Sequence, residues 1–129
     1  MIDKSTILAN IEIMQTTIEQ FNGLDVNATI DYLAEITSLQ STATETQASA
    51  KYWLLQAIND ELDRQAKLMK KDDIAPSIKK MRADSICAEM HYIYEKSQRL
   101  SSAISHTIDA VRTKISYLKQ EMENNKYSN

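Results

Sequence analysis

Apolar residues recur at helical spacing along nearly the whole chain. The first run has five members at alternating steps of four and three residues: Ile7, Ile11, Met14, Ile18 and Phe21. This spacing places all five on one face of a helix, predicted over residues 4–21. Asn22-Gly23 is expected to end the helix, because glycine adopts the left-handed conformation at a helix C-terminus without steric cost.

A second helix is predicted over residues 28–69, with Asn27 as its N-cap. Its apolar stripe has two parts: Ile30, Leu33, Ile36 and Leu39, then Ala50, Leu54, Ile58 and Leu62. Between them lies "STATETQASA", which fits either a weakly packed helical middle or a break. The continuous helix is favoured, since no glycine or proline interrupts the segment and alanine is the best helix former.

A third helix is predicted over residues 74–124, after the turn "KKDDIAPS". Asp72 or Asp73 can cap it, and Pro76 falls in its first turn, where the missing N–H costs little. The stripe has eleven members: Ile86, Met90, Ile93, Ser97, Leu100, Ile104, Ile108, Val111, Ile115, Leu118 and Met122. Ten steps cover 36 residues, a mean of 3.6, which indicates a straight helix in a bundle instead of a supercoiled pair.

The predicted fold is all-α, a long antiparallel helical hairpin with a shorter N-terminal helix along one end. One glycine and one proline in 129 residues leave few turns, so the chain is expected to form a single helical domain over 1–129, frayed at 125–129. At about 1.5 Å per residue the two long helices measure about 60 and about 75 Å, too long to bury their stripes alone. Aromatic residues beside the stripes favour a homo-oligomer that completes the bundle.

Composition and charge bear on the cellular compartment of the protein and on its binding partners. No apolar run approaches the roughly 18 residues of a membrane span, and "MIDKSTILAN" lacks the apolar region of a secretory signal. One cysteine excludes an internal disulfide. A soluble protein of the bacterial cytoplasm is expected, without a membrane partner. A net charge of −3 and a pI near 5.4 argue against generic nucleic-acid binding.

No constellation of residues predicts an enzyme, a metal site or a cofactor. One glycine cannot build a phosphate-binding loop or a nucleophile elbow. His91 and His106 lie fifteen residues apart on one predicted helix, about 22 Å. Cys87 has no adjacent cation to lower its pKa. The carboxylates of the first half, Glu61 among them, are expected on outer, solvated helix faces.

Charge is distributed unevenly and suggests one binding surface. Residues 1–63 carry two lysines against ten acids, whereas residues 64–82 carry seven cations against two acids. The seven are Arg64, Lys67, Lys70, Lys71, Lys79, Lys80 and Arg82. They converge on the tip of the predicted hairpin, where they could contact phosphates or an acidic protein. They could equally solubilise a turn and complement a helix C-terminus.

Aromatic residues form the other candidate surface. Trp53, Tyr92, Tyr94 and Tyr117 fall beside the main stripes. Amphipathic aromatic side chains are enriched in protein–protein contacts, and they are equally suited to the core of a bundle. Both interpretations remain open at this point.

Residues 45–122 resemble a loose class of small helical proteins encoded by bacteriophages and integrated mobile elements. The resemblance rests on "AKYWLLQAIND", a basic turn, and a final helix with this pattern: Val111, Arg112, Thr113, Ile115, Ser116, Leu118, Lys119 and Glu121. It implies an accessory protein without assigned catalytic residues, encoded near recombination or single-strand-binding genes.

The expected function is therefore non-enzymatic binding of a host or phage protein, in one form the inhibition of a host defence factor. The alternative is a nucleic-acid-binding accessory of phage recombination or replication that uses the basic tip. The pattern favours the first of these two hypotheses.

Overall fold

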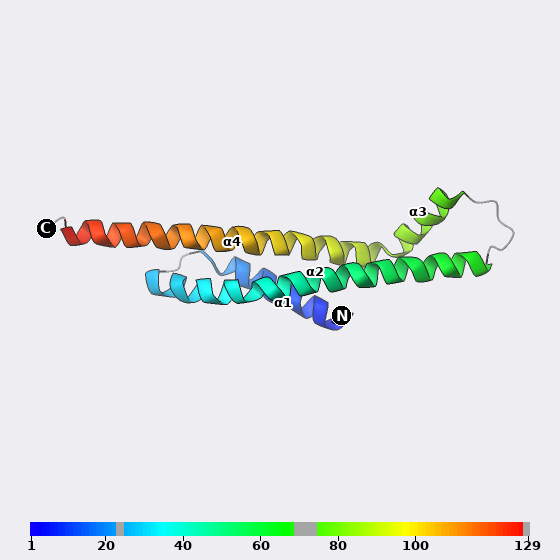
Figure 1. Ribbon diagram of the computed structural model, residues 1–129, viewed down its shortest axis with the longest axis horizontal. Coiled ribbons are helices and arrows are strands. Elements are labelled where there is room, and N and C mark those ends of the chain that lie inside the picture. Colours follow the sequence, from blue (N-terminus) through cyan, green and yellow to red (C-terminus); the bar gives the residue numbers. More distant parts are fainter. Residues whose placement is uncertain (23–24, 69–74, 128–129) are drawn as a thin grey trace.

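The computed structural model describes residues 1–22, 25–68 and 75–127. These residues form four helices and no strand: α1 (Lys4–Glu19), α2 (Val26–Leu68), α3 (Pro76–Ile86) and α4 (Ala88–Tyr127). Figure 1 shows α2 and α4 side by side in opposite directions, with the shorter α1 along them. The predicted all-α hairpin with an N-terminal helix is confirmed.

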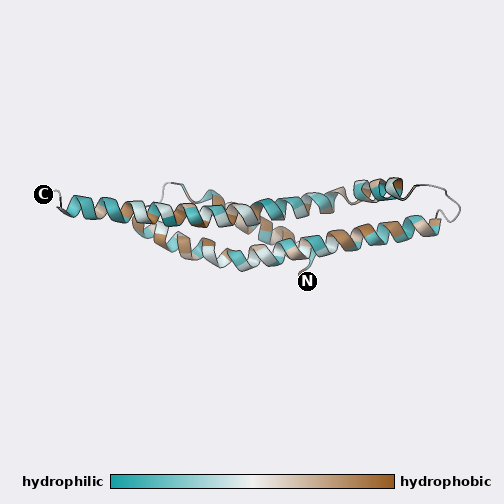
Figure 2. Cartoon of the chain, turned by 45° about the horizontal axis from the view of Figure 1, so that its top comes forward, coloured by the Kyte–Doolittle hydropathy of each residue, from teal (hydrophilic) through white to brown (hydrophobic). Residues whose placement is uncertain are grey.

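The core lies where α1, α2 and α4 meet. The buried side chains come from the predicted stripes of all three helices: Ile7, Ile11, Met14, Ile36, Ile104, Ile108 and Val111. Each amphipathic helix presents its apolar face to the other two, since that is how a helix removes its stripe from water. Figure 2 shows hydrophobic residues, in brown, along α2, while α4 is mostly hydrophilic on the side in view.

The alanine- and threonine-rich middle of α2 is helical, as favoured from the sequence, and is the docking site of α1. Thr46 and Ser49 are buried. The Asn10 amide donates to Thr46 Oγ1 over 3.1 Å, and the Ile2 N–H donates to Ser49 Oγ over 3.3 Å. The Trp53 indole N–H donates to the Ile2 carbonyl over 2.7 Å. Small polar residues therefore occur in this stripe because α1 and the residues just before it supply their hydrogen-bond partners.

Two predicted helix starts are corrected. α2 begins at Val26. The backbone N–H of Ala28, in the first turn, donates to the Asp25 carboxylate over 2.8 Å, so Asp25 caps the helix instead of Asn27. Pro76 stands in the first turn of its helix, as predicted, but the N-cap position is Ala75. Gly23, Asp72 and Asp73, to which stop and cap roles were assigned, lie outside the described residues.

The predicted continuous helix over residues 74–124 is wrong at one position. It divides into α3 and α4 at Cys87, whose backbone angles are φ −90° and ψ 16°. The break lets Ala83 and Cys87 become buried, whereas Ile86, the expected stripe member, is 59% exposed. No glycine or proline marks the position, so a helix-breaker search passes over it.

At its other end α4 extends further than predicted. It reaches Tyr127, and every residue from Lys119 to Lys126 is exposed. Figure 1 shows this red segment continuing past the start of α2. Met122, on the core-facing stripe, is 58% exposed because no helix lies opposite it among the described residues. We call residues 118–127 the projecting end.

Candidate functional site

A concave site lies where α2, α3 and α4 meet. The departure of α3 from the hairpin opens a groove of about 410 Å³ beside the break at Cys87. We call it the junction groove, and its lining residues are Ala57, Asp60, Glu61, Arg64, Ile86, Cys87, Glu89 and Met90. A hollow of about 240 Å³ adjoins it, lined by Arg64, Gln65, Arg82, Ser85 and Ile86.

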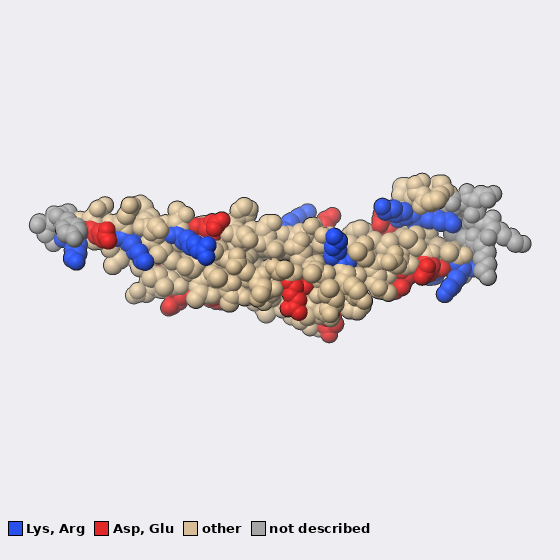
Figure 3. All heavy atoms as spheres, viewed as in Figure 1, with Lys and Arg blue, Asp and Glu red and all other residues tan. Residues whose placement is uncertain are grey.

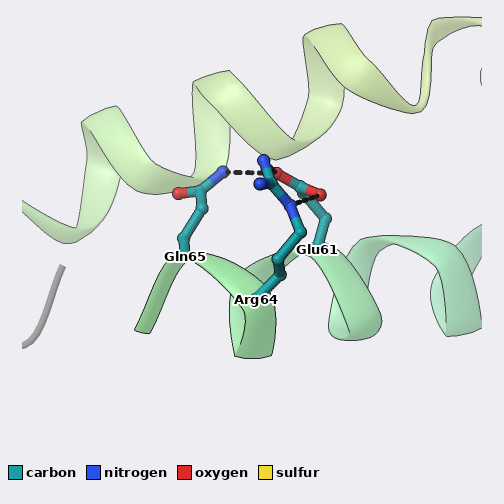
Figure 4. A network of polar contacts seen from close by, with 3 residues as sticks. All are labelled: Glu61, Arg64 and Gln65. Atoms are coloured by element: carbon teal, nitrogen blue, oxygen red, sulfur yellow. Dashed lines mark hydrogen bonds and ion pairs between the residues drawn. The ribbon is translucent and has the colours of Figure 1, made fainter. Parts of the chain in front are cut away.

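A buried carboxylate lies in the wall of the junction groove. Glu61 is only 8% exposed, which corrects its expected place on an outer face. Arg64 donates from Nη2 to Glu61 Oε1 over 2.6 Å and from Nε to Oε2 over 2.9 Å (Figure 4). This two-point contact lowers the pKa of the Glu61 carboxyl against the opposing effect of burial. The carboxylate is therefore ionised and held in one orientation.

Gln65 extends this network and leaves one acceptor without a partner. The residue is 3% exposed, and its Nε2 donates to Glu61 Oε1 over 3.3 Å. Figure 4 shows the amide oxygen turned away from Glu61. Among the described residues no group donates to this buried oxygen. The Glu61 carboxylate can only accept hydrogen bonds, so the Gln65 side chain turns its NH₂ group toward it. The Gln65 amide oxygen therefore points away and needs a donor from elsewhere.

The Glu61 network is expected to make stability depend on pH. The pKa of Glu61 is lower in the folded chain than in the unfolded chain. Its ionised carboxylate therefore adds to the free energy of unfolding above the unfolded-state pKa, and this stabilisation is lost as the pH falls through the folded-state pKa. We expect Glu61→Gln to flatten the loss of unfolding free energy between about pH 6 and about pH 3, the range in which carboxyls titrate. Urea unfolding at several pH values measures this slope. Arg64→Leu should flatten it too, and an unchanged slope in both variants would refute the assignment.

The other titratable groups near the break are Cys87, Asp84 and His91. Burial, Glu61 and Asp84 raise the pKa of the Cys87 thiol, so the thiolate is disfavoured. His91 Nε2 lies 3.3 Å from Asp84 Oδ1 across the break. Within residues 1–22, 25–68 and 75–127, no three His, Cys, Asp or Glu side chains are placed to hold a metal ion.

α3 carries exposed apolar side chains that we call the apolar rim, namely Ile78, Met81 and Ile86, and Ile86 lines the junction groove. All eleven residues of α3 are described, and among them only Ala83 is buried. Its large apolar side chains are exposed: Ile78 by 45%, Met81 by 69% and Ile86 by 59%. An isolated helix this short is marginal in water and gains its stability from packing. The rim is therefore apolar surface that the folded chain leaves uncovered.

The basic tip is only partly a cluster. Arg64 is bound to Glu61, whereas Lys67 and Lys80 are exposed and Lys79 is half-buried. Arg82 is exposed and lines the hollow beside the groove. Lys70 and Lys71 lie outside the described residues. Figure 3 shows cations near α3 and along the last part of α4, with acids among them at both ends.

The aromatic candidates separate into two pairs. Trp53 and Tyr94 are half-buried against the core. Tyr92 and Tyr117 are 60% and 63% exposed, and both lie on α4. The Lys96 ammonium lies 5.9 Å from the centre of the Tyr92 ring. The four therefore do not form one surface.

Sequence reasoning missed Glu61 and Gln65, although the pattern contains a signal for them. Glu61 lies seven residues after Leu54, and Gln65 lies four residues after Glu61. This spacing places both on the face of the helix that carries the buried stripe. A polar residue in the phase of a core stripe marks a buried polar contact. The neighbouring Leu62 had been assigned to that stripe, and it is half-buried.

Comparison of the chain with protein-family models, curated proteins and solved structures found no match. Among the described residues, none of the helices has the length and apolar character that crossing a membrane requires.

Proposed function

We propose that the chain is a non-enzymatic helical protein of bacteriophage or mobile-element type that acts in the bacterial cytoplasm by binding another protein through the junction groove. The observation that carries this proposal is the apolar rim of α3, in which Ile78, Met81 and Ile86 are exposed and Ile86 lines the groove. Exposed apolar side chains grouped around a concavity are typical of protein-binding sites.

The polar part of the groove supports a protein ligand over a small one. Asp60 and Glu89 supply carboxylates, with Lys4 Nζ 2.8 Å from Glu89 Oε1, whereas Glu61 is engaged by Arg64. In the adjoining hollow the buried Gln65 amide oxygen has no donor among the described residues. An amphipathic helix meets these demands, since it places apolar side chains and cationic donors on one face. Inhibition of a host defence factor is one form that such binding would take.

A site-specific photocrosslinker tests the proposal. Placed at Ser85, an exposed residue of α3, it should form an adduct with a defined protein in host cells. Placed at Ser102, an exposed residue of α4, it should not. The Ser85 adduct should fall about tenfold with Met81→Glu, as the loss of one well-packed contact implies, and persist with Met81→Leu. Equal adducts at the two positions, or an adduct indifferent to Met81→Glu, would contradict the proposal.

The nucleic-acid alternative has narrower support. Among the described residues it relies on Lys67, Lys79, Lys80 and Arg82 at the tip, since Arg64 is engaged by Glu61. Phosphate binding through these cations would weaken steeply with salt, whereas an apolar rim contact would not. Salt-sensitive retention on duplex DNA would therefore favour this alternative.

A further inference from the structure

On α2, the junction groove continues the face on which α1 packs. The Trp53 indole N–H donates to the Ile2 carbonyl, just before the start of α1. Ala57 lies one turn after Trp53 and lines the groove, and Glu61, one further turn on, lines it too. Residues four apart are neighbours on one face of a helix. The row of α2 residues at the start of α1 therefore runs on into the groove.

α4 contributes a second row with the same property. The Lys4 ammonium, in the first turn of α1, lies 2.8 Å from Glu89 Oε1, and Glu89 lines the groove. Four residues further along α4, Ile93 is buried in the core that α1 shares. Three residues before Glu89, Ile86 lines the groove. Figure 1 shows the N-terminal end of α1 directed toward the end of the molecule that carries α3. α1 thus covers part of a face formed by α2 and α4, and the groove is an uncovered part of it.

The residues that precede α1 run away from the groove. The Ser49 hydroxyl lies 3.4 Å from Met1 Sδ and accepts a hydrogen bond from the Ile2 N–H. Ser49 lies one turn before Trp53 on α2, whereas the groove begins one turn after it, at Ala57. The start of the chain therefore runs back along α2 and leaves the groove uncovered.

From this continuity we propose that the junction groove binds an amphipathic helix of a partner protein, placed end to end with α1. The inference rests on the proposed function, because it names the element of the partner that enters the same groove. From Ala57 to Arg64 the groove follows α2 for about 10 Å, which matches about two turns of an opposing helix. The bound helix needs apolar side chains three and four residues apart, as α1 has, because the same two helices receive it.

The lining of the groove suits such a helix. Cys87 is buried, and Ala57 and Met90 are half-buried, so these three side chains form an apolar floor. Ala57 is small and leaves room for a larger side chain to enter between its neighbours, as in the packing of knobs into holes. Ile86 is 59% exposed on the side of α3, where a bound helix would cover it.

α1 of a second copy is not available as the occupant. Its apolar residues Ile7, Ile11 and Met14 are at most 5% exposed, because they pack in the core of their own chain. Their release would expose that core to water, which opposes the exchange. The helix in the groove therefore belongs to a different protein.

A synthetic peptide with the sequence of α1, residues 4–19, is the probe, because that helix fits the adjoining part of the same face. A hydrocarbon staple on its polar side keeps it helical. The α1 of the full chain is tethered and has a high effective concentration at its own place, which leaves the groove to the peptide. In nuclear magnetic resonance spectra of the full chain, the peptide should shift the signals of Ala57, Ile86 and Met90. A stapled peptide of the same composition with scrambled apolar spacing should not.

Two variants with the same added charge locate the binding. Ile86→Glu should weaken binding of the α1 peptide by about tenfold or more, because it places a carboxylate in an apolar contact. Tyr117→Glu is the matched control and should leave the affinity unchanged, since Tyr117 does not line the groove. The two side chains are 59% and 63% exposed, so both substitutions leave the core intact, which circular dichroism checks.

The contrary outcomes are distinct. Unshifted groove signals, equal shifts with the scrambled peptide, or binding indifferent to Ile86→Glu would each overturn the helix site. Self-association of the unaltered chain that Ile86→Glu abolishes in sedimentation velocity would place a second copy in the groove and overturn it too. Failure of the peptide beside a Ser85 adduct that depends on Met81 would overturn this inference and leave the proposed function standing. Peptide binding in the groove without such an adduct would support the helix site and count against the proposed function.

Discussion

Ile11→Ala should lower the free energy of unfolding by about 2–5 kcal/mol, the usual cost of truncating a buried isoleucine. Ile11 is 5% exposed and packs in the cluster shared by α1, α2 and α4. Typical domains are stable by about 5–15 kcal/mol, so this loss is a large share of the total. α1 has sixteen residues and depends on that packing to stay helical. Urea unfolding followed by far-ultraviolet circular dichroism measures the change.

Ile13→Ala is the matched control for this prediction. It removes the same side chain from the same helix, two residues away, but Ile13 is 51% exposed. Its effect should stay within about 0.5 kcal/mol, since substitutions at surface positions away from special features change little. Equal losses in the two variants would contradict the placement of α1 on the hairpin.

Ala50→Leu should destabilise the chain although it adds apolar surface. Ala50 is fully buried in the middle of α2, where the neighbouring buried residues are also small: Ala43, Thr46 and Ser49. Packing of this density leaves no room for three more carbon atoms, and overfilling a core typically costs about 1–3 kcal/mol. The midpoint of urea unfolding should fall accordingly.

Ala48→Leu distinguishes overpacking from a general effect of leucine in α2. Ala48 is exposed in the same helical segment, so the added side chain meets solvent. Alanine and leucine differ little in helix propensity, and the variant should retain the stability of the unaltered chain. A loss as large as that of Ala50→Leu would show that leucine weakens the helix itself.

The helices could be predicted from the sequence because each is determined locally. The stripe from Ile7 to Phe21 and the stripe from Met90 to Leu118 have helical spacing over several turns, and few glycines or prolines interrupt the chain. Such spacing dictates both the helix and the face that it buries. The antiparallel pairing of the two long helices followed, since neither could bury its stripe alone.

The contacts of α1 and the preceding residues with α2 were not predictable in the same way, because they join distant segments of the chain. Asn10 and Ile2 give Thr46 and Ser49 their polar partners, and the Trp53 indole N–H donates to the Ile2 carbonyl. The local sequence does not indicate these pairings, because the paired residues lie 36, 47 and 51 positions apart.

The break at Cys87 is the clearest case of a feature decided by tertiary structure. The local sequence around Ile86 favours a straight helix, and the chain bends there so that Ala83 and Cys87 pack in its place. That bend opens the junction groove, exposes the rim of α3 and makes Glu61 part of a wall. Sequence by itself determined the helices and their apolar faces, since these depend on neighbouring residues. Where those faces end, and which polar groups they enclose, depended on the packing of α1, α2 and α4 together.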